Sequence, residues 1–332
     1  MVGKPATSAD GDAASYMTAQ ALSAAFVAEY QYNKWNTGVM FWQYSSDPSG
    51  TIVNQTISSL MTISISNSSN STTTNTTTNT TASNATNPTN ASNASNNASG
   101  ISLSLPIRFI YIDGITNWSS AAGLAASLGV PGYAPAHSYN YIALSFWLYP
   151  SKPADAALLW SNPSTYFGTT TFGANDSAIR DTLKSKYNNS GIKLLVSAFG
   201  PTQKPTSLGI DPAACATNLA KFVTDNILDG VDIDWEDTPA FQNGTGEAWL
   251  ITFTTTLRQL LPNAIITHSP QAPYFGGTAL YPKNAYLAVH QAVGSMIQFY
   301  NVQFYSQGST PYNTANLLFN CSGGWAPGTS VN

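Results

Sequence analysis

The stretch DGVDIDWE, residues 229–236, sets three carboxyl groups at alternate positions among Val, Ile and Trp. Side chains along a β-strand point to opposite faces in turn, so Asp232, Asp234 and Glu236 are expected to share one face. Carboxyls crowded into a buried interior cannot all ionise at low cost, so their titrations are coupled and one can stay protonated near neutral pH. A general acid needs such a proton. The stretch therefore predicts a buried strand that carries a catalytic acid, Glu236, at its carboxyl end.

Apolar, strand-like runs recur on both sides of this stretch. They cover residues 108–112, 141–148, 193–199, 264–269 and 299–305. Helical patterns separate several of them, over residues 176–186, 211–228 and 246–261. Continuous apolar strands that alternate with helices indicate a parallel sheet covered on both faces. Residues 101–332 therefore supply six βα units, which are too few to close a (β/α)8 barrel.

Residues 1–60 offer the two strands that such a barrel lacks. A helix is expected over residues 12–30, and the run GVMFWQY at 38–44 is typical of a buried strand. Residues 1–3 fit the tail of another strand. We therefore expect an α/β fold, a (β/α)8 barrel built from residues 101–332 together with residues 1–60.

A polar tract separates these two pieces. Between residues 66 and 99 the chain contains only Ser, Asn, Thr, Ala and one Pro, which cannot bury a core. We expect residues 61–100 to form a disordered linker. Eight of the fourteen Asn-x-Ser/Thr sequons of the chain lie there, and the chain is accordingly expected to be a secreted, extracellular glycoprotein. The expected glycosylation sites in the tract are Asn67, Asn70, Asn75, Asn79, Asn84, Asn90, Asn93 and Asn97.

The composition excludes several classes of partner. Only 8% of the residues are charged, against roughly 25% in an average soluble domain, and the net charge is −4 with no basic block. Nucleic acid is therefore not expected as a partner, and a neutral polysaccharide suits this surface better. No apolar run is long enough to span a membrane. Residues 1–15 are polar and show no signal peptide, so a secreted form is expected to be processed or partial.

Cysteine and histidine show no metal-ligand spacing. The three histidines, His137, His268 and His290, are scattered along the chain, so neither a metal nor another cofactor is expected. The two cysteines, Cys215 and Cys321, fall on predicted helices that are far apart in barrel order. They are not expected to pair within one chain, and both a free buried state and a bond between chains stay open.

The run DGVDIDWE resembles the DGxDxDxE signature of family 18 glycoside hydrolases, which include chitinases and endo-β-N-acetylglucosaminidases. Residues 196–200, VSAFG, stand where the family often has Ser-x-Gly-Gly, with Phe199 in place of the first of those glycines. Other segments resemble strands of the small plant and fungal type of this family. Residues 109–111 resemble the first strand, 143–147 the second, 269–273 the fifth, 301–305 the sixth and 41–42 the eighth.

The resemblance also implies an unusual strand order. Residues 2–5 and 38–44 resemble the seventh and eighth strands of the family, yet here they precede the first. The chain is therefore expected to be circularly permuted or to be one period of a tandem array. Residues 1–60 would complete either the barrel of their own chain or that of a neighbouring copy, which would allow head-to-tail self-assembly.

The resemblance further implies a substrate-assisted, retaining cleavage of β-1,4 linkages in N-acetylglucosamine polymers such as chitin. Glu236 would protonate the glycosidic oxygen, and Asp234 would hold the acetamido N–H and share a proton with Asp232. Tyr305 would hydrogen-bond the acetamido carbonyl, and Trp42 would stack under the sugar ring. Both of these aromatic residues are also plausible in ordinary core packing. Further contacts with the sugar are expected from Tyr111, Trp147, Gln271 and Gln303.

A second function stays open on the same fold. Because a fold does not by itself give a function, the chain could be a non-enzymatic, sugar-binding or filament-forming structural glycoprotein on a chitinase-like barrel. The presence of Glu236 together with Asp232, Asp234 and Tyr305 favours the enzyme.

Overall fold

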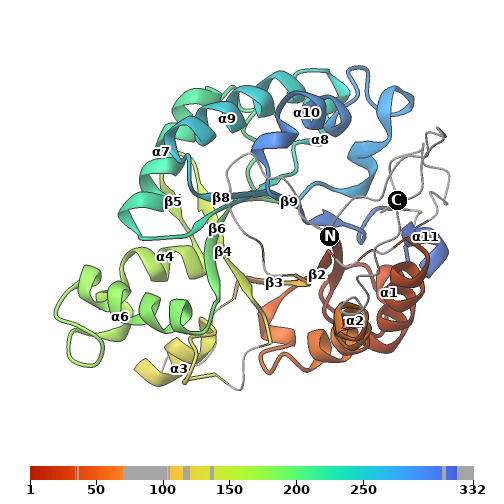
Figure 1. Cartoon of the computed structure of the whole chain (residues 1–332). Coiled ribbons are helices and arrows are strands. Elements are labelled where there is room, and N and C mark those ends of the chain that lie inside the picture. The colour runs from red at the N-terminus through yellow and green to blue at the C-terminus, as the bar shows by residue number, and fades with distance from the viewer. Residues whose placement is uncertain are drawn as a thin grey trace, which may run out of the picture.

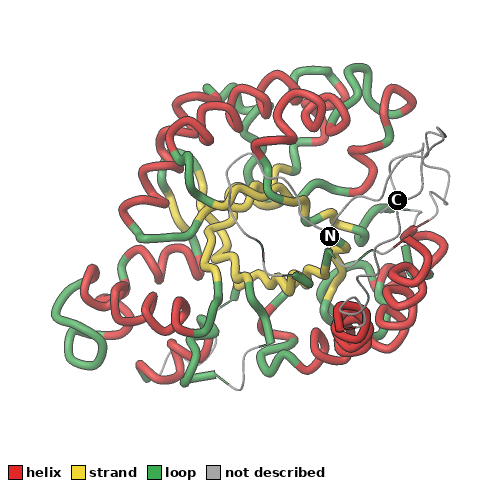
Figure 2. Tube along the Cα trace, viewed as in Figure 1, coloured by secondary structure: helices red, strands yellow, loops and turns green. Residues whose placement is uncertain are grey.

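Parallel strands form a closed ring in the centre of the molecule, and helices surround that ring (Figures 1 and 2). This computed structural model describes residues 1–33, 35, 37–69, 103, 105–114, 120–134, 138–308 and 312–319. The strands of the ring are β1 (Val2–Pro5), β2 (Gly38–Trp42), β3 (Ile107–Ile112), β4 (Tyr141–Leu148), β6 (Lys193–Gly200), β7 (Gly230–Trp235), β8 (Ile265–His268), β9 (Phe299–Tyr300) and β10 (Val302–Gln303). The predicted strands are thus confirmed, with ends that move by a few residues.

The last strand closes the barrel because it is divided into two short parts. β9 pairs with β8 through Thr267 and Phe299, whereas β10 pairs with β1 through Val2 and Val302. Asn301 separates the two parts, and its backbone N–H still donates to the His268 carbonyl at 2.8 Å. The path β10-β1-β2-β3-β4-β6-β7-β8-β9 has nine segments, and counting β9 with β10 as one leaves eight. The predicted (β/α)8 barrel is therefore confirmed.

The first two strands lie between the last strand and β3 of the same chain. β1 pairs with both β10 and β2, and β2 pairs with β3 from Gly38 opposite Ile107 to Phe41 opposite Ile110. Gly38 has a φ of 128°, and a Cβ there would lie 2.0 Å from the Ile107 carbonyl oxygen, so only glycine fits this approach. Residues 1–60 thus contribute to the barrel of their own chain here. A permutation relative to the family order stays a prediction.

The helices that follow β1 and β2 differ from expectation. The helix expected over 12–30 begins later, as α1 (Ala19–Asn33), after a single 3-10 turn. α2 (Thr51–Ser69) was not predicted and extends into the expected linker; the rest of the tract, with seven of its eight sequons, lies outside the described residues. A signal for α2 is present, because Val53, Ile57 and Leu60 have helical spacing and are buried.

The remaining helices cover the outside of the sheet. Three of them match the predicted helical patterns, α6 (Asp176–Asn189), α7 (Pro212–Asp225) and α9 (Gly246–Leu260). α7 begins as predicted, because Asp211 accepts a hydrogen bond from the Ala214 N–H at 2.7 Å and a proline occupies the first helical position. The others are α3 (Ala121–Ser127), α4 (Asp155–Ser161), α5 (Pro163–Phe167), α8 (Thr238–Gln242), α10 (Tyr286–Val293) and α11 (Ala315–Phe319), and the short strand β5 (Lys152–Pro153) pairs antiparallel with β4.

Two hydrophobic cores lie on the two faces of the barrel sheet. The outer core fills the space between strands and helices, and the inner core fills the amino-terminal part of the barrel with residues such as Phe109, Tyr141 and Phe299. The inner core leaves the carboxyl ends of the strands to polar residues. Cys215 lies buried on α7, whereas Cys321 lies outside the described residues. Within the described part of the chain, no helix is long and apolar enough to cross a membrane.

Candidate active site

Asp232 lies fully buried inside the barrel and is held by five side chains from β3, from β6, from β8 and its end, and from the link between β9 and β10. Its Oδ1 accepts hydrogen bonds from Thr267 and Asn301, and its Oδ2 accepts them from Tyr111, Ser197 and Ser269. The five distances run from 2.5 Å to 3.1 Å. A carboxylate offers about four lone-pair sites, so the barrel wall occupies the acceptor capacity of Asp232. This geometry gives Asp232 a supporting position in the floor of the site. A proton shared between Asp232 and Asp234 stays a prediction.

Asp234 and Glu236 are bridged by one amide group. Gln303 Nε2, from β10, donates to Asp234 Oδ1 at 2.8 Å, to Glu236 Oε1 at 3.2 Å and to the Ser269 carbonyl at 2.9 Å. Gln271 Nε2, just after β8, donates to Glu236 Oε2 at 3.2 Å. Two amides from neighbouring strand ends therefore fix the orientation of both carboxyl groups.

Burial changes the proton affinity of this pair. Burial raises the pKa of Asp234 well above its ordinary value, and the nearby Glu236 and Asp232 raise it further. Burial also raises the pKa of Glu236, although hydrogen bonds from Gln303 and Gln271 oppose the rise. The arrangement therefore favours a carboxyl group that keeps a proton at higher pH than a free glutamate does, which suits a general acid.

Two aromatic residues form walls beside the carboxyl pair. Trp42 ends β2, which is four strand positions from β7 in either direction around the ring, and it lines the same cavity as Glu236. Its ring stacks on Phe146 with centroids 5.9 Å apart and an interplanar angle of 22°. Tyr305 follows β10, and burial raises the pKa of its hydroxyl well above the ordinary value, so it stays a donor.

The cavity between these residues has a volume of about 270 Å³, just below the range of about 300–1,000 Å³ that is usual for small-molecule sites. It lies at the carboxyl ends of the strands, where (β/α)8 barrels carry their active sites. Its lining residues are Asp10, Trp42, Phe146, Pro201, Asp234, Glu236, Gln271, Gln303, Tyr305, Ser306 and Gln307. Six of the nine residues expected at the site on the basis of the sequence therefore line this one cavity.

The structure places Trp147 outside the cavity, contrary to expectation. Strict alternation along β4 would turn Trp147 inward with Tyr141 and Ala143, but the pairing with β6 shifts register between Leu144 and Trp147. Trp147 is consequently fully buried in the outer core, where it packs against Phe199. Phe146 takes the inward position and lines the cavity instead.

Tyr111 lies below the cavity rather than in its wall. Its hydroxyl donates to Asp232 at 2.8 Å, and its ring lies 5.7 Å from that of Trp42. It therefore connects the floor of the site to the aromatic wall.

Five lining residues were not anticipated from the sequence: Asp10, Phe146, Pro201, Ser306 and Gln307. Asp10 and the pair Ser306–Gln307 follow shortly after the strands β1 and β10. The signal that could have found them is a polar side chain directly after a strand, because the carboxyl ends of all barrel strands meet at one face.

Phe199 adopts a backbone conformation that glycine normally takes. Its φ is 78°, in the left-handed region, and Gly200 follows with a φ of 63°. Packing holds the phenyl ring in the outer core against Trp249 and Phe253, with centroid distances of 5.9 and 5.7 Å. The chain therefore keeps this conformation in spite of a bulky side chain, at a cost on the order of 1–3 kcal/mol.

A loop after β6 brings a positive charge toward the acid. Asp237, next to Glu236 in the chain, is fully buried and accepts hydrogen bonds from the Ser207 N–H at 2.6 Å and the Ser207 hydroxyl at 2.5 Å. Gln203 in the same loop bonds to the backbone N–H and carbonyl of Tyr149 at 2.8 and 2.9 Å. The loop so fixed carries Lys204, whose charge lowers the pKa of Glu236.

A buried lysine fixes the segment on the opposite side. Lys4 on β1 is fully buried, and its Nζ donates to the carbonyls of Phe304 and Tyr312, both at 2.8 Å. These two carbonyls flank the segment that carries Tyr305, Ser306 and Gln307 into the cavity wall. Burial lowers the pKa of Lys4 to about 7.

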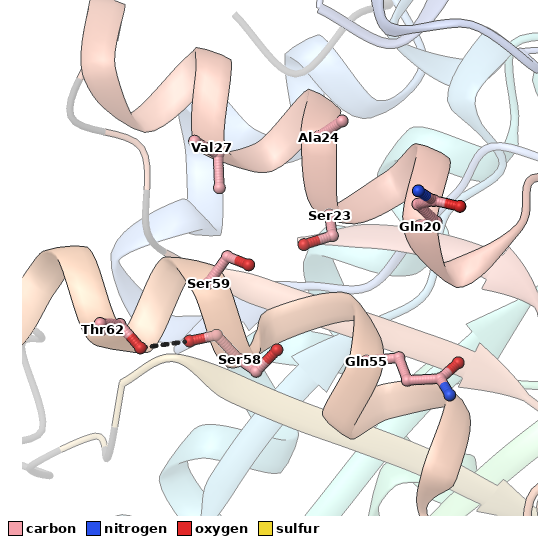
Figure 3. A pocket seen from close by; sticks show the side chains of 8 residues that line it. All are labelled: Gln20, Ser23, Ala24, Val27, Gln55, Ser58, Ser59 and Thr62. Atoms are coloured by element: carbon pink, nitrogen blue, oxygen red, sulfur yellow. Dashed lines mark hydrogen bonds between the residues drawn. The ribbon is translucent and has the colours of Figure 1, made fainter.

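A second hollow lies far from this chemistry, between α1 and α2 (Figure 3). The side chains around it are Gln20, Ser23, Ala24, Val27, Gln55, Ser58, Ser59 and Thr62, none of which titrates near neutral pH. It therefore offers no acid or base. Across the described residues, no group of three or more His, Cys, Asp or Glu side chains could hold a metal ion.

The similarity of this chain to known proteins is found among solved structures. No model of a known protein family and no curated protein matches the chain. Among solved structures, the chain is similar to a family 18 chitinase from Pseudoalteromonas aurantia, with 30% identity over 61% of this chain and 69% of that chain and a TM-score of 0.43.

Two further structures are similar at lower identity. A fungal endo-β-N-acetylglucosaminidase of family 18 is 15% identical, covering 61% of this chain and 68% of that chain, with a TM-score of 0.41. The catalytic domain of a family 18 chitinase from the fern Peteris ryukyuensis is 19% identical, covering 61% and 69%, with a TM-score of 0.38.

Proposed function

Because the chain belongs to glycoside hydrolase family 18, we propose that it cleaves β-1,4 linkages of N-acetylglucosamine polymers by a substrate-assisted, retaining mechanism. The observation that carries the proposal is the amide of Gln303, which holds Asp234 and Glu236 side by side in a cavity also lined by Trp42 and Tyr305. One buried acid, one supporting carboxyl and a hydroxyl donor are what an acetamido-assisted reaction requires.

The first step breaks the glycosidic bond. Glu236 gives its proton to the glycosidic oxygen, while the 2-acetamido oxygen of the substrate attacks the anomeric carbon and forms an oxazolinium ion. Asp234 accepts the acetamido N–H and balances the positive charge of that ion, and Tyr305 donates to the acetamido oxygen. The product with the new hydroxyl group leaves.

The second step restores the enzyme. The Glu236 carboxylate takes a proton from water, and the water oxygen attacks the anomeric carbon on the face that the leaving group vacated. The oxazolinium ring opens back to the acetamide, so the configuration is retained.

Asp10 raises the question of a mechanism with two carboxylates, because it lines the same cavity. Its Oδ2 accepts hydrogen bonds from the N–H and the hydroxyl of Thr7, both at 2.7 Å, and its Oδ1 accepts one from Ser46 at 2.7 Å. These three hydrogen bonds already occupy most of the acceptor sites of the Asp10 carboxylate, which favours the acetamido group as the nucleophile.

The test is turnover of a chromogenic chito-oligosaccharide by Glu236→Gln. This change keeps the shape but removes the proton, so we expect a loss of rate of at least about 10²-fold. The matched control is Asp225→Asn, the same loss of charge at an exposed ion pair on α7, which is expected to leave the rate unchanged. A wild-type rate in Glu236→Gln would contradict the proposed acid.

The substrate class is tested with cello-oligosaccharides, which share the linkage but lack the acetamido group. We expect no cleavage of these compounds and retention of configuration in the first product formed from chito-oligosaccharides. Comparable rates on both sugars, or inversion, would rule out acetamido assistance.

We also propose that the protein is a secreted glycoprotein. Support comes from the sequons outside the polar tract, since Asn54, Asn175, Asn188 and Asn243 are all exposed. Mass spectrometry of native protein that finds no glycan at any sequon would contradict this proposal.

A further inference from the structure

Asp10 is fixed at the mouth of the barrel between the ends of two strands. It lies in the loop after β1, and Thr7 in that loop binds its Oδ2 through two hydrogen bonds of 2.7 Å. Ser46, which follows β2 and Trp42, binds its Oδ1 at 2.7 Å. The carboxylate is therefore held in one orientation beside the tryptophan wall of the cavity.

The three donors to Asp10 are neutral groups, and no ion pair of Asp10 is found within the described part of the chain. Among the described residues that line the cavity there are three carboxyl groups, those of Asp10, Asp234 and Glu236, and no lysine or arginine. Burial raises the pKa values of Asp234 and Glu236, so these two tend to keep a proton between them. Asp10 is only half-buried, and its carboxylate belongs to the lining of the same cavity.

One acceptor site of Asp10 stays available to a ligand. Among the described residues, the donors from Thr7 and Ser46 occupy three of the roughly four lone-pair sites of this carboxylate, and the remaining site is on Oδ1. A positively charged N–H group gives the strongest hydrogen bond to such an oxygen. In a polymer of N-acetylglucosamine, the group of this kind is the protonated 2-amino group of a unit that has lost its acetyl group.

We propose that Asp10 is a specificity-determining residue that binds the 2-ammonium group of a glucosaminyl unit next to the reacting N-acetylglucosaminyl ring. This inference rests on the proposed function and names its substrate more narrowly, as a partially deacetylated chitin chain. The reacting ring keeps its acetyl group, because that group is the nucleophile. The neighbouring ring places its amino group against Asp10.

The first test measures binding to the unaltered protein by calorimetry. The probes are chito-oligosaccharides of one length, either fully acetylated or about half deacetylated, at a pH where the sugar amines carry a proton. We expect the partially deacetylated probe to bind about tenfold more tightly, the size of one hydrogen bond between charged groups, and this preference to shrink at high salt. Equal binding, or a preference that salt does not change, would overturn the proposal.

The second test uses Asp10→Asn, which keeps the shape of the side chain and removes its charge. We expect it to lose the preference and to keep binding of the fully acetylated probe within about threefold, a change smaller than one hydrogen bond. The matched control is Asp12→Asn, a neighbouring exposed aspartate outside the cavity lining, which is expected to keep the preference. Equal loss in both variants would show a general charge effect and contradict a specific role of Asp10.

Turnover separates this inference from the proposed function. Sequencing of the products from half-deacetylated chitosan by mass spectrometry is expected to find glucosamine enriched at one position next to the cleaved N-acetylglucosamine, in the unaltered protein but not in Asp10→Asn. Loss of all turnover on the fully acetylated substrate in Asp10→Asn would overturn the inference and indicate a two-carboxylate mechanism. A wild-type rate in Glu236→Gln would instead contradict the proposed function, while the binding preference could still be measured.

Discussion

In strand β7 the side chains alternate between the two faces to the end of the strand. Val231, Ile233 and Trp235 lie in the outer core, and Asp232 and Asp234 lie inside the barrel. Period two therefore carries the acids of DGVDIDWE into the site as the sequence predicts.

In strand β4, on the same barrel, the alternation breaks. Tyr141 and Ala143 face inward, but after the register shift Phe146 lines the cavity and Trp147 lies in the outer core. Comparison of β7 with β4 shows that period-two alternation predicts which side chains share a face only as long as the strand has no bulge.

The largest expected effect is a loss of activity when Asp234, an inward-facing residue of β7, is changed. Asp234→Asn removes the charge that would balance the oxazolinium ion, so kcat should fall by about 10²-fold or more while the protein stays folded. Steady-state kinetics on a chromogenic chito-oligosaccharide, with circular dichroism as the check on folding, measures this. The exposed Asp225→Asn serves as control, and equal rates in the two variants would break the assignment of β7 as the catalytic strand.

The next effect concerns stability and tests the outward position in β4. Trp147→Ala should lower the free energy of unfolding by about 3–5 kcal/mol, because it opens a cavity in the outer core. Trp147→Phe keeps most of the volume and should cost much less. Urea denaturation measures the free energy of unfolding of both variants. If Trp147→Ala instead raises KM and leaves the free energy of unfolding nearly unchanged, Trp147 belongs to the site.

A change at Phe146 tests the inward position in β4, and its expected effect is smaller. Phe146→Ala removes the ring on which Trp42 stacks, so the tryptophan loses its support and KM should rise by about tenfold, which corresponds to about 1.4 kcal/mol. kcat/KM on a chito-oligosaccharide measures the effect. If Phe146→Ala matches wild type while Trp147→Ala raises KM, the assignment of the two neighbours is reversed.

The smallest effect is a shift in pH dependence. The proposed role of Glu236 as the acid requires that its carboxyl group is protonated, and the charge of Lys204 lowers the pKa of that group. Lys204→Met should therefore raise that pKa, so that activity persists to higher pH, and the alkaline limb of kcat/KM should move up by less than about one unit. Lys221→Met, at an exposed ion pair on α7, should leave the limb in place. A downward shift in Lys204→Met would contradict the sign of the interaction.

Several parts of the molecule could be predicted because local patterns decide them. The strands β4, β6 and β7 have the long apolar runs of buried parallel strands, and α7 has its Asp211 cap and its proline at the first position. α2 was not predicted, because the polar residues around Val53, Ile57 and Leu60 mask the helical spacing of these three buried side chains.

Local patterns along the chain are enough to predict that Asp232, Asp234 and Glu236 share one face and that the strands fill eight positions in a barrel, because side-chain period and apolar runs are local properties. Three other features appear only in the folded chain: β1 and β10 close the barrel, the bulge in β4 exchanges Phe146 for Trp147, and Asp10 lines the same cavity as Glu236. These features depend on pairing between residues far apart in the chain, such as Val2 with Val302, and no local pattern encodes such a pairing.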